Sequence, residues 1–205
     1  MSRHHSLFGK RKTIQRLPKK VLIVCEGEKT EPNYFRSFSI NKELIDVEVL
    51  GAGKNTDSLV EYVIELKNKS EKRNNQYSHI WCVFDRDSFS AQQFNRALQI
   101  AQNHGIKVAY SNEAFEVWYI LHFEYCQTGL NRSMYEAKLT KLLGSKYLKN
   151  DTAMYAKLLD KQLNAVRWAK MLIENYGEKH NPEKHNPCTK VYELVEFLNR
   201  YLEDE

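Results

Sequence analysis

The sequence predicts an α/β fold, with a parallel-rich sheet of about four strands, helices on both faces of the sheet, and an α-helical C-terminal part. Three observations predict it. After residue 18, the apolar residues switch repeatedly between a strand-like period and a helix-like period. Beyond Tyr110 the pattern is almost entirely helical. The 205 residues are 42% hydrophobic and 28% charged, a composition typical of one globular domain.

Four apolar segments of the first half have the length and pattern of strands, and helical patterns separate them. Strand–helix alternation of this kind favours a parallel sheet covered on both faces. Pro32 suits the first turn of the first helix, and Gly105 is placed to end the third. The expected strands are 20–25, 45–50, 79–84 and 106–110, and the helices begin near 32, run from 57 to about 69, and run from 90 to 103.

The second half predicts four helices. Asn112 opens a strongly apolar one, 114 to about 125. Ser133 and Glu136 have the spacing of a capping box, and Gly144 ends the short helix that follows. Asp151 caps a long helix to about 176, and a polar loop leads to a final amphipathic helix through Val191, Leu194, Val195, Leu198 and Leu202. We therefore divide the chain into an arm (1–18), an α/β core (19–125) and a helical part (126–205).

The positive charge of the chain is concentrated at its N-terminus. Residues 1–20 hold seven of the 31 Lys and Arg side chains and no acid, so the remainder carries 24 basic against 26 acidic groups. We expect a poorly ordered arm that binds nucleic-acid phosphates and gains affinity by releasing counterions. A solubilising tail is the alternative. The basic residues of this region are Arg3, Lys10, Arg11, Lys12, Arg16, Lys19 and Lys20.

The sequence contains no sign of a membrane span, a signal peptide or paired cysteines, which bears on where the protein is located. No apolar run approaches the ~20 residues of a membrane span, and the N-terminus lacks the apolar core of a signal peptide. The four cysteines, Cys25, Cys82, Cys126 and Cys188, are widely spaced and contain no C-x-x-C pair. We interpret them as reduced thiols and expect a cytoplasmic protein.

Carboxylates follow two of the predicted strands. Glu26 ends the first strand, and Asp85 and Asp87 end the third. If these strands are neighbours, their carboxyl ends meet at one edge of the sheet and the three acids converge. Acids without matching bases favour a cation, and oxygen-only ligands favour Mg²⁺ or Mn²⁺. The alternative is that these acids are helix caps or solvated turn residues.

Two other motifs are weaker. The segment GAGKNTD, from Gly51 to Asp57, lacks the spacing of a phosphate-binding loop, so a loop leading into a helix is the better interpretation. Lys54 within it remains a candidate contact to backbone phosphate. His180, His185 and Cys188 lie in a loop without an evident fourth zinc ligand.

Four segments, in this order, closely resemble the RloB family: LIVCEGEKTEPNYF, FDRD, SNEAFEVWYILHF and NPCTKVYELVEFL. Members of this family are Toprim-like proteins encoded near restriction–modification loci and related to the second component of AbiL-type abortive-infection systems. The resemblance covers essentially the whole chain after the arm. The segments EGEKTE and SN..FE.W..LHF are specific to it.

The resemblance implies a Toprim-like Mg²⁺ site held by Glu26, Asp85 and Asp87. It places Glu116 near the same crevice and makes Lys29 the candidate for neutralising a phosphate. The family pattern has a proline where this chain has Glu113, so either Glu113 or Glu116 faces the metal.

The implied activity is phosphodiester cleavage. A metal would polarise the scissile phosphate and activate a water, with Glu116, Glu28 or Glu31 as the general base.

The resemblance also implies partners. These are DNA or RNA as substrate, and an ABC- or OLD-like ATPase, since this chain has no nucleotide-binding motif of its own. The expected role is that of an effector in antiphage defence, and a homo-oligomer is compatible with it. Two rival functions stay open: a non-catalytic module that binds nucleic acid or a partner, and a primase-like nucleotidyl transferase.

Overall fold

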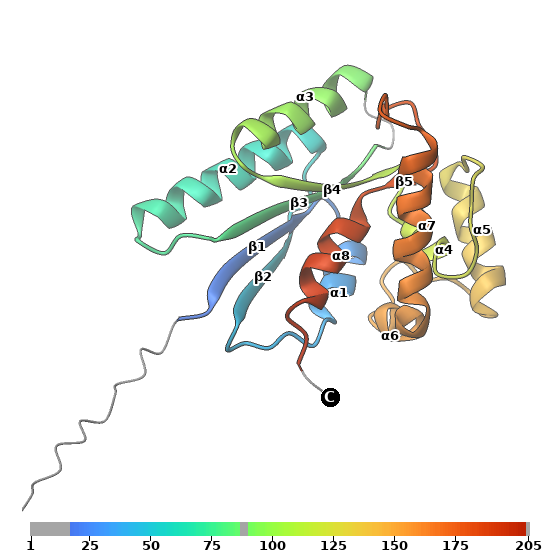
Figure 1. The fold of residues 1–205 in the computed structure, drawn as a ribbon, viewed down its shortest axis with the longest axis horizontal. Helices are drawn as coiled ribbons and strands as arrows, with labels where there is room; N and C mark the ends of the chain where they lie inside the picture. Colours follow the sequence, from blue (N-terminus) through green and yellow to red (C-terminus); the bar gives the residue numbers. More distant parts are fainter. Residues whose placement is uncertain (1–16, 87–89, 204–205) are drawn as a thin grey trace, which may run out of the picture.

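The computed structural model describes residues 17–86 and 90–203. Helices and strands alternate in the first half of the chain, and the second half is mainly helical (Figure 1). In chain order the elements are β1 (Lys19–Cys25), α1 (Thr30–Arg36), β2 (Ile45–Gly51), α2 (Thr56–Lys72), β3 (His79–Asp85), α3 (Ala91–Asn103), β4 (Lys107–Asn112), α4 (Glu116–Ile120), α5 (Arg132–Leu143), α6 (Met154–Leu158), a 3-10 turn (Leu159–Lys161), α7 (Gln162–Asn175), β5 (Cys188–Thr189) and α8 (Val191–Asn199).

The sheet has five strands in the order β2-β1-β3-β4-β5. The strands β1 to β4 are parallel, and β5 pairs antiparallel with the end of β4. The predicted fold class is therefore confirmed. Since β1 and β3 are neighbours, the residues that follow their carboxyl ends lie at the same edge of the sheet.

Two apolar cores lie on opposite faces of this sheet. In β1, Val21 and Ile23 belong to one core while Leu22 and Val24 belong to the other, because successive strand side chains point to opposite faces. Helices α2 and α3 cover one face, and α1 and α8 cover the other (Figure 1). Burial on both faces explains why β1 reads as one continuous apolar run.

The C-terminal part differs from the prediction in two ways. It is not wholly helical, because Cys188 and Thr189 form β5 and extend the sheet. The single long helix expected from Asp151 is α6, a 3-10 turn and α7. The apolar stripe continues through the turn, but α6 packs against α1 while α7 packs against α8 and β5. One straight helix cannot reach both sets of partners, so tertiary packing overrides the local periodicity.

Three helix boundaries also differ from the prediction. Asn112 ends β4 instead of opening a helix, and α4 is only five residues long. The cap of α5 is Asn131, whose Oδ1 accepts from the Met134 N–H at 3.1 Å, so the predicted capping box at Ser133 is wrong. Leu202 lies beyond α8, in an isolated bridge to Ile40. The expected ends at Gly105 and Gly144 are confirmed by their positive φ angles, 68° and 66°.

The helices of the described ranges are too short or too polar to span a membrane. All four cysteines are buried and free.

Candidate acidic site at the carboxyl edge of the sheet

The centre of the candidate site is a direct contact between the ends of β1 and β3. The Glu26 N–H donates to the Val83 carbonyl at 2.8 Å, which continues the strand pairing by one residue. The Glu26 Oε2 then accepts the Asp85 N–H at 3.1 Å. Glu26 is half-buried and Asp85 is buried. The predicted meeting of these two residues at one edge of the sheet follows from the strand order.

Two further carboxylates, Glu31 and Glu116, belong to the same cluster. Glu31 lies in the first turn of α1 and Glu116 begins α4, and both are buried. Burial raises the pKa of Asp85 well above its usual range, and the charges of Glu31, Glu116 and Glu26 raise it further. A hydrogen bond from the Phe115 backbone acts in the opposite direction. We call Glu26, Glu31, Asp85 and Glu116 the acidic cluster.

The raised pKa of Glu31 shows that the cluster disfavours the ionised form of this carboxylate. Burial is the main cause that raises its pKa to about 7, and the nearby charge of Glu116 adds to it. A hydrogen bond within Glu31 and the charges of Arg132 and Lys149 lower it. Glu31 is thus near the midpoint of its titration at neutral pH, where an ordinary glutamate is ionised.

Two glycines, one in the turn between β1 and α1 and one in the loop after β2, lie against carboxylates of α1 and of that turn. A Cβ at Gly27 would collide with the Glu31 carboxylate. Gly53 has φ +57°, and a Cβ there would lie 2.6 Å from the Glu28 Oε1. The turns after β1 and β2 therefore pack together, which is why the sequence EGE is compatible with this local structure.

The helical part supplies one wall of the site. The Tyr147 hydroxyl, from the loop between α5 and α6, donates to the Glu116 Oε1 at 3.2 Å. The same loop is held to α1, because the Thr30 hydroxyl donates to the Lys149 carbonyl at 2.8 Å. Burial and the charge of Glu116 raise the pKa of Tyr147, so its phenol stays protonated and serves as the donor.

The structure places the other predicted residues as follows. Lys29 is exposed at the N-cap of α1, and Lys54 is exposed with its Nζ 5.2 Å from the centre of the Tyr62 ring. The charge of Glu116 raises the pKa of Asp85, and the charges of Glu113 and Asp85 both raise the pKa of Tyr135. That Glu113 or Glu116 faces a metal stays a prediction. The predicted ligand Asp87 and the arm residues Arg3, Lys10, Arg11, Lys12 and Arg16 lie outside the described residues.

The acidic cluster fits a hard cation in its chemistry. Its donors are carboxylate oxygens, the type that Mg²⁺ and Mn²⁺ prefer, and neighbouring negative charges raise the pKa of Asp85 and of Glu31. Within 17–86 and 90–203, however, no group of three or more His, Cys, Asp or Glu side chains is arranged to hold a metal ion.

Sequence reasoning missed three residues around the acidic cluster: Arg132, Tyr147 and Lys149. The first and third lie close enough to lower the pKa of Glu31, and Tyr147 bonds Glu116. All three lie more than 100 positions after Glu26 or Glu31, and no local pattern links them to the strand ends. In the sequence, only their side-chain type, two basic and one phenolic, could have indicated that they contact carboxylates.

In His180 and His185, two of the three residues considered as zinc ligands, ring nitrogens lie at hydrogen-bonding distance from other groups of the protein. The His180 Nδ1 lies 2.9 Å from the His185 Nδ1, and the His180 Nε2 lies 2.8 Å from the Tyr110 hydroxyl. Because the His185 Nδ1 accepts the Asn181 N–H at 3.0 Å, the proton between the two rings belongs to His180. Burial raises the pKa of Cys188 to about 12, which keeps it a thiol.

Comparison with known proteins gives one positive result. A family model described as RloB-like protein matches residues 21–198, which is most of the chain. No curated protein and no solved structure matches.

Proposed function

The chain belongs to the RloB family, and from this premise we propose that it is a Toprim-type, metal-dependent nuclease that cleaves phosphodiester bonds. We propose further that it acts as an effector of antiphage defence together with an ATPase partner. The substrate is a nucleic acid, DNA or RNA.

One observation carries this proposal: four carboxylates, from α1, β3, α4 and the turn after β1, converge where the parallel strands end. Catalytic residues of open α/β sheets collect at this edge. Buried acids with raised pKa values are costly for a fold, and they concentrate at functional sites.

The roles of the residues follow from their positions. Glu26 and Asp85, with Asp87 outside the described residues, would hold Mg²⁺ or Mn²⁺. The ion supplies neutralisation of charge on the phosphate and a lower pKa for an attacking water. Glu116 and Glu31 are the candidate general bases, since both are buried in the cluster, whereas Glu28 is exposed. Exposed Lys29 is free to contact a substrate phosphate.

The test uses the full chain with labelled DNA or RNA, Mg²⁺ or Mn²⁺, and the cognate ATPase partner. We expect the chain without its partner to be a slow or silent nuclease. With the partner, cleavage should require the divalent ion and be abolished by Glu26→Gln, which keeps the shape of the side chain and removes its charge. Glu61→Gln, on the exposed face of α2, is the control and should cleave normally. Full cleavage by Glu26→Gln would remove the proposal.

Two further variants separate the roles within the site. Lys29→Ala should lower the rate by about tenfold or more, with Mn²⁺ affinity unchanged in calorimetry. Glu116→Gln should abolish turnover. Retained Mn²⁺ affinity in that variant would make Glu116 a base, and a loss of affinity would make it a ligand.

A second candidate is a non-catalytic binding module. It is favoured by the finding that the described side chains alone form no metal-binding group. The same experiment separates the two functions: a binding module retains affinity for the oligonucleotide in Glu26→Gln and cleaves nothing under any condition, with or without nucleoside triphosphates.

A further inference from the structure

A second feature of the described structure is a groove whose lining includes no member of the acidic cluster. It has a volume of about 1260 Å³ and lies beside β4, the strand next to the edge of the sheet. Helix α3 lies on one side of β4 and helix α8 on the other (Figure 1). Leu98 and Gln102 line the groove from α3, Glu196 and Arg200 line it from α8 and its end, and Leu163 lines it from α7.

The backbone of β4 faces this groove with open hydrogen-bonding groups. The Ser111 carbonyl accepts the Arg86 N–H at 2.8 Å, so Ser111 and alternate residues before it face β3. Val108 and Tyr110 therefore face outward. The Tyr110 carbonyl accepts the Lys190 N–H, which shows this direction independently.

The strand β5 covers only the last part of that edge. It pairs with Ser111 and Asn112, and the chain then turns into α8 at Lys190. Within the described residues, no hydrogen bond reaches the N–H or C=O of Val108 or the N–H of Tyr110. An edge of this kind is a template for one more strand.

The side chains at the start of the groove are positively charged. The Lys107 ammonium lies 5.0 Å from the Trp81 ring centre and 5.8 Å from that of Phe197, and the Arg200 guanidinium lies 5.3 Å from the same Phe197 ring. Among the described side chains, no carboxylate forms an ion pair with either cation. The acids of the groove are already neutralised, since Glu193 pairs with Lys190 at 2.9 Å and Glu196 pairs with Lys170 at 2.6 Å.

Two further features agree with a binding surface of this charge. Burial lowers the pKa of the nearby His79, and the charges of Lys107, Lys19 and Arg200 lower it further, which reports a positive potential at this end of the sheet. Leu163 is 83% exposed at the rim of the groove, more than any other large apolar side chain of the described residues except Leu17.

We propose that the open edge of β4 binds an extended, acidic segment of a partner protein, which adds to the sheet in line with β5. The partner's backbone bonds Val108 and Tyr110, an acidic side chain lies between Lys107 and Arg200, and an apolar side chain covers Leu163. This inference does not depend on the proposed nuclease activity.

The test is a selection of random twelve-residue peptides displayed on phage against the immobilised full chain. We expect enriched peptides with acidic residues and strand-like alternation. A synthetic peptide of the enriched sequence should slow the hydrogen exchange of the Val108 and Tyr110 amides and leave the Ala109 amide, which faces β3, unchanged. N-methylation of alternate peptide residues should weaken binding by about tenfold or more, because it removes strand-pairing donors.

Two variants of the protein complete the test. Val108→Pro removes an outward N–H without removing a bond to β3, and Lys107→Glu/Arg200→Glu reverses the charge; both should abolish peptide binding. Lys141→Glu/Lys146→Glu, on and after α5, is the matched control and should retain it. The second variant decides the outcome if the first does not fold.

Three results would overturn the proposal. One is the absence of any peptide enriched on the wild type over the charge-reversed variant. Another is a bound peptide that tolerates N-methylation or protects other amides. The third is a concentration-dependent dimer that Val108→Pro abolishes, which would make a second copy of this chain the occupant.

Discussion

Glu31 combines burial with neighbouring negative charges, the two features of the candidate site that raise its pKa. Its carboxylate is buried against Gly27 and lies near Glu116 and Asp85. Burial and like charges both favour the protonated form, so the folded protein binds a proton there that the unfolded chain releases. The site therefore reduces stability at the pH at which its carboxylates would be charged.

We expect Glu31→Gln to stabilise the protein in the presence of a metal chelator. The folded pKa of about 7 lies above the ordinary 4.5, so the penalty is fully present above pH 7 and absent below pH 4.5. The gain in unfolding free energy should be about 1 to 3 kcal/mol at pH 8 and should shrink as the pH falls to 5.

Thermal melts at both pH values check this prediction. Glu61→Gln, an exposed glutamate of α2, is the control and should change the melting temperature at neither pH. A Glu31→Gln protein that is less stable than the wild type at pH 8 would contradict the argument, because it would make the carboxylate a net stabilising group.

The helix α5 illustrates how one residue decides where an element begins. Both Asn131 and Ser133 are good cap residues, and Ser133 has the right spacing to Glu136. In the structure Asn131 bonds the Met134 N–H, and the Ser133 hydroxyl donates to the Asn131 Oδ1 at 2.7 Å. The helix thus starts earlier than predicted, and Ser133 supports the cap instead of forming it.

We expect Asn131→Ala to lower the unfolding free energy by about 1 kcal/mol, since it leaves the Met134 N–H without its cap. Ser133→Ala should cost less than half as much. Urea denaturation measures both values, and amide exchange at Met134 should accelerate only in Asn131→Ala. The reverse ranking would restore the capping box at Ser133.

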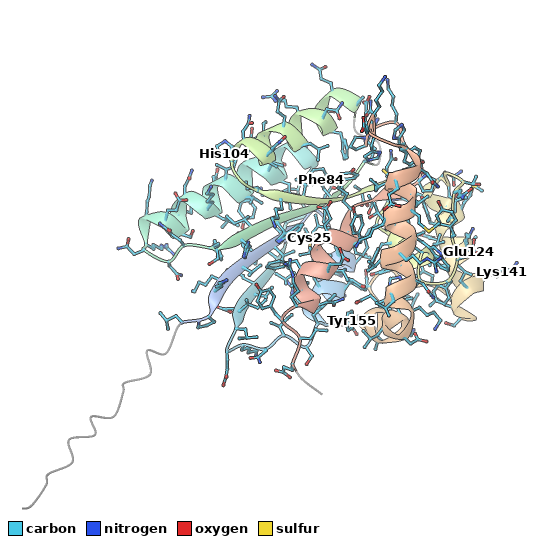
Figure 2. The ribbon with its side chains drawn as sticks, viewed as in Figure 1. Cys25, Phe84, His104, Glu124, Lys141 and Tyr155 are labelled. Carbon is cyan, nitrogen blue, oxygen red and sulfur yellow. The ribbon has the colours of Figure 1, made fainter. Side chains whose placement is uncertain are left out.

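Over the whole molecule, the acidic cluster adjoins a region that carries positive charge. Residues 126–161 hold seven Lys and Arg side chains and three acids. Figure 2 shows Lys141 on the outer side of α5. Lys149 and Arg132 lie close enough to the acidic cluster for their charges to lower the pKa of Glu31. In the proposed function, a nucleic acid that enters the site would meet this surface in addition to the arm.

This arrangement predicts two separable contributions to nucleic-acid binding. Lys141→Glu/Lys146→Glu should weaken binding of a single-stranded oligonucleotide and reduce the slope of log K against log salt by about 0.7 for each phosphate that the variant no longer neutralises. Deleting residues 2–17 should reduce the slope independently, so that the combined variant shows both reductions.

A salt titration of fluorescence anisotropy measures these slopes. Lys42→Glu/Lys72→Glu makes the same change in net charge at exposed positions outside residues 126–161 and is the control. An equal reduction of the slope in this control would mean that only net charge matters. An unchanged slope in the arm deletion would leave the helical surface as the whole binding site.

Much of this protein was determined by its sequence. The strands are apolar runs in the sequence, the helices of the first half show one-sided periodicity, and Glu26 and Asp85 stand where their strands end. These signals are local, because strand pairing and helix burial impose a period on neighbouring residues. The family membership was also readable from short segments around the same residues.

Tertiary structure decided what local patterns do not contain. The break between α6 and α7 depends on two different packing partners, and the two-residue β5 exists only because β4 offers it an edge. The nearness of Glu116 to Asp85, the Tyr147 hydrogen bond to Glu116, and the open backbone of Val108 likewise depend on residues distant in sequence. Interactions of this kind are fixed by the burial of whole elements against one another, so the physical reason for them lies in the packed fold rather than in any one segment.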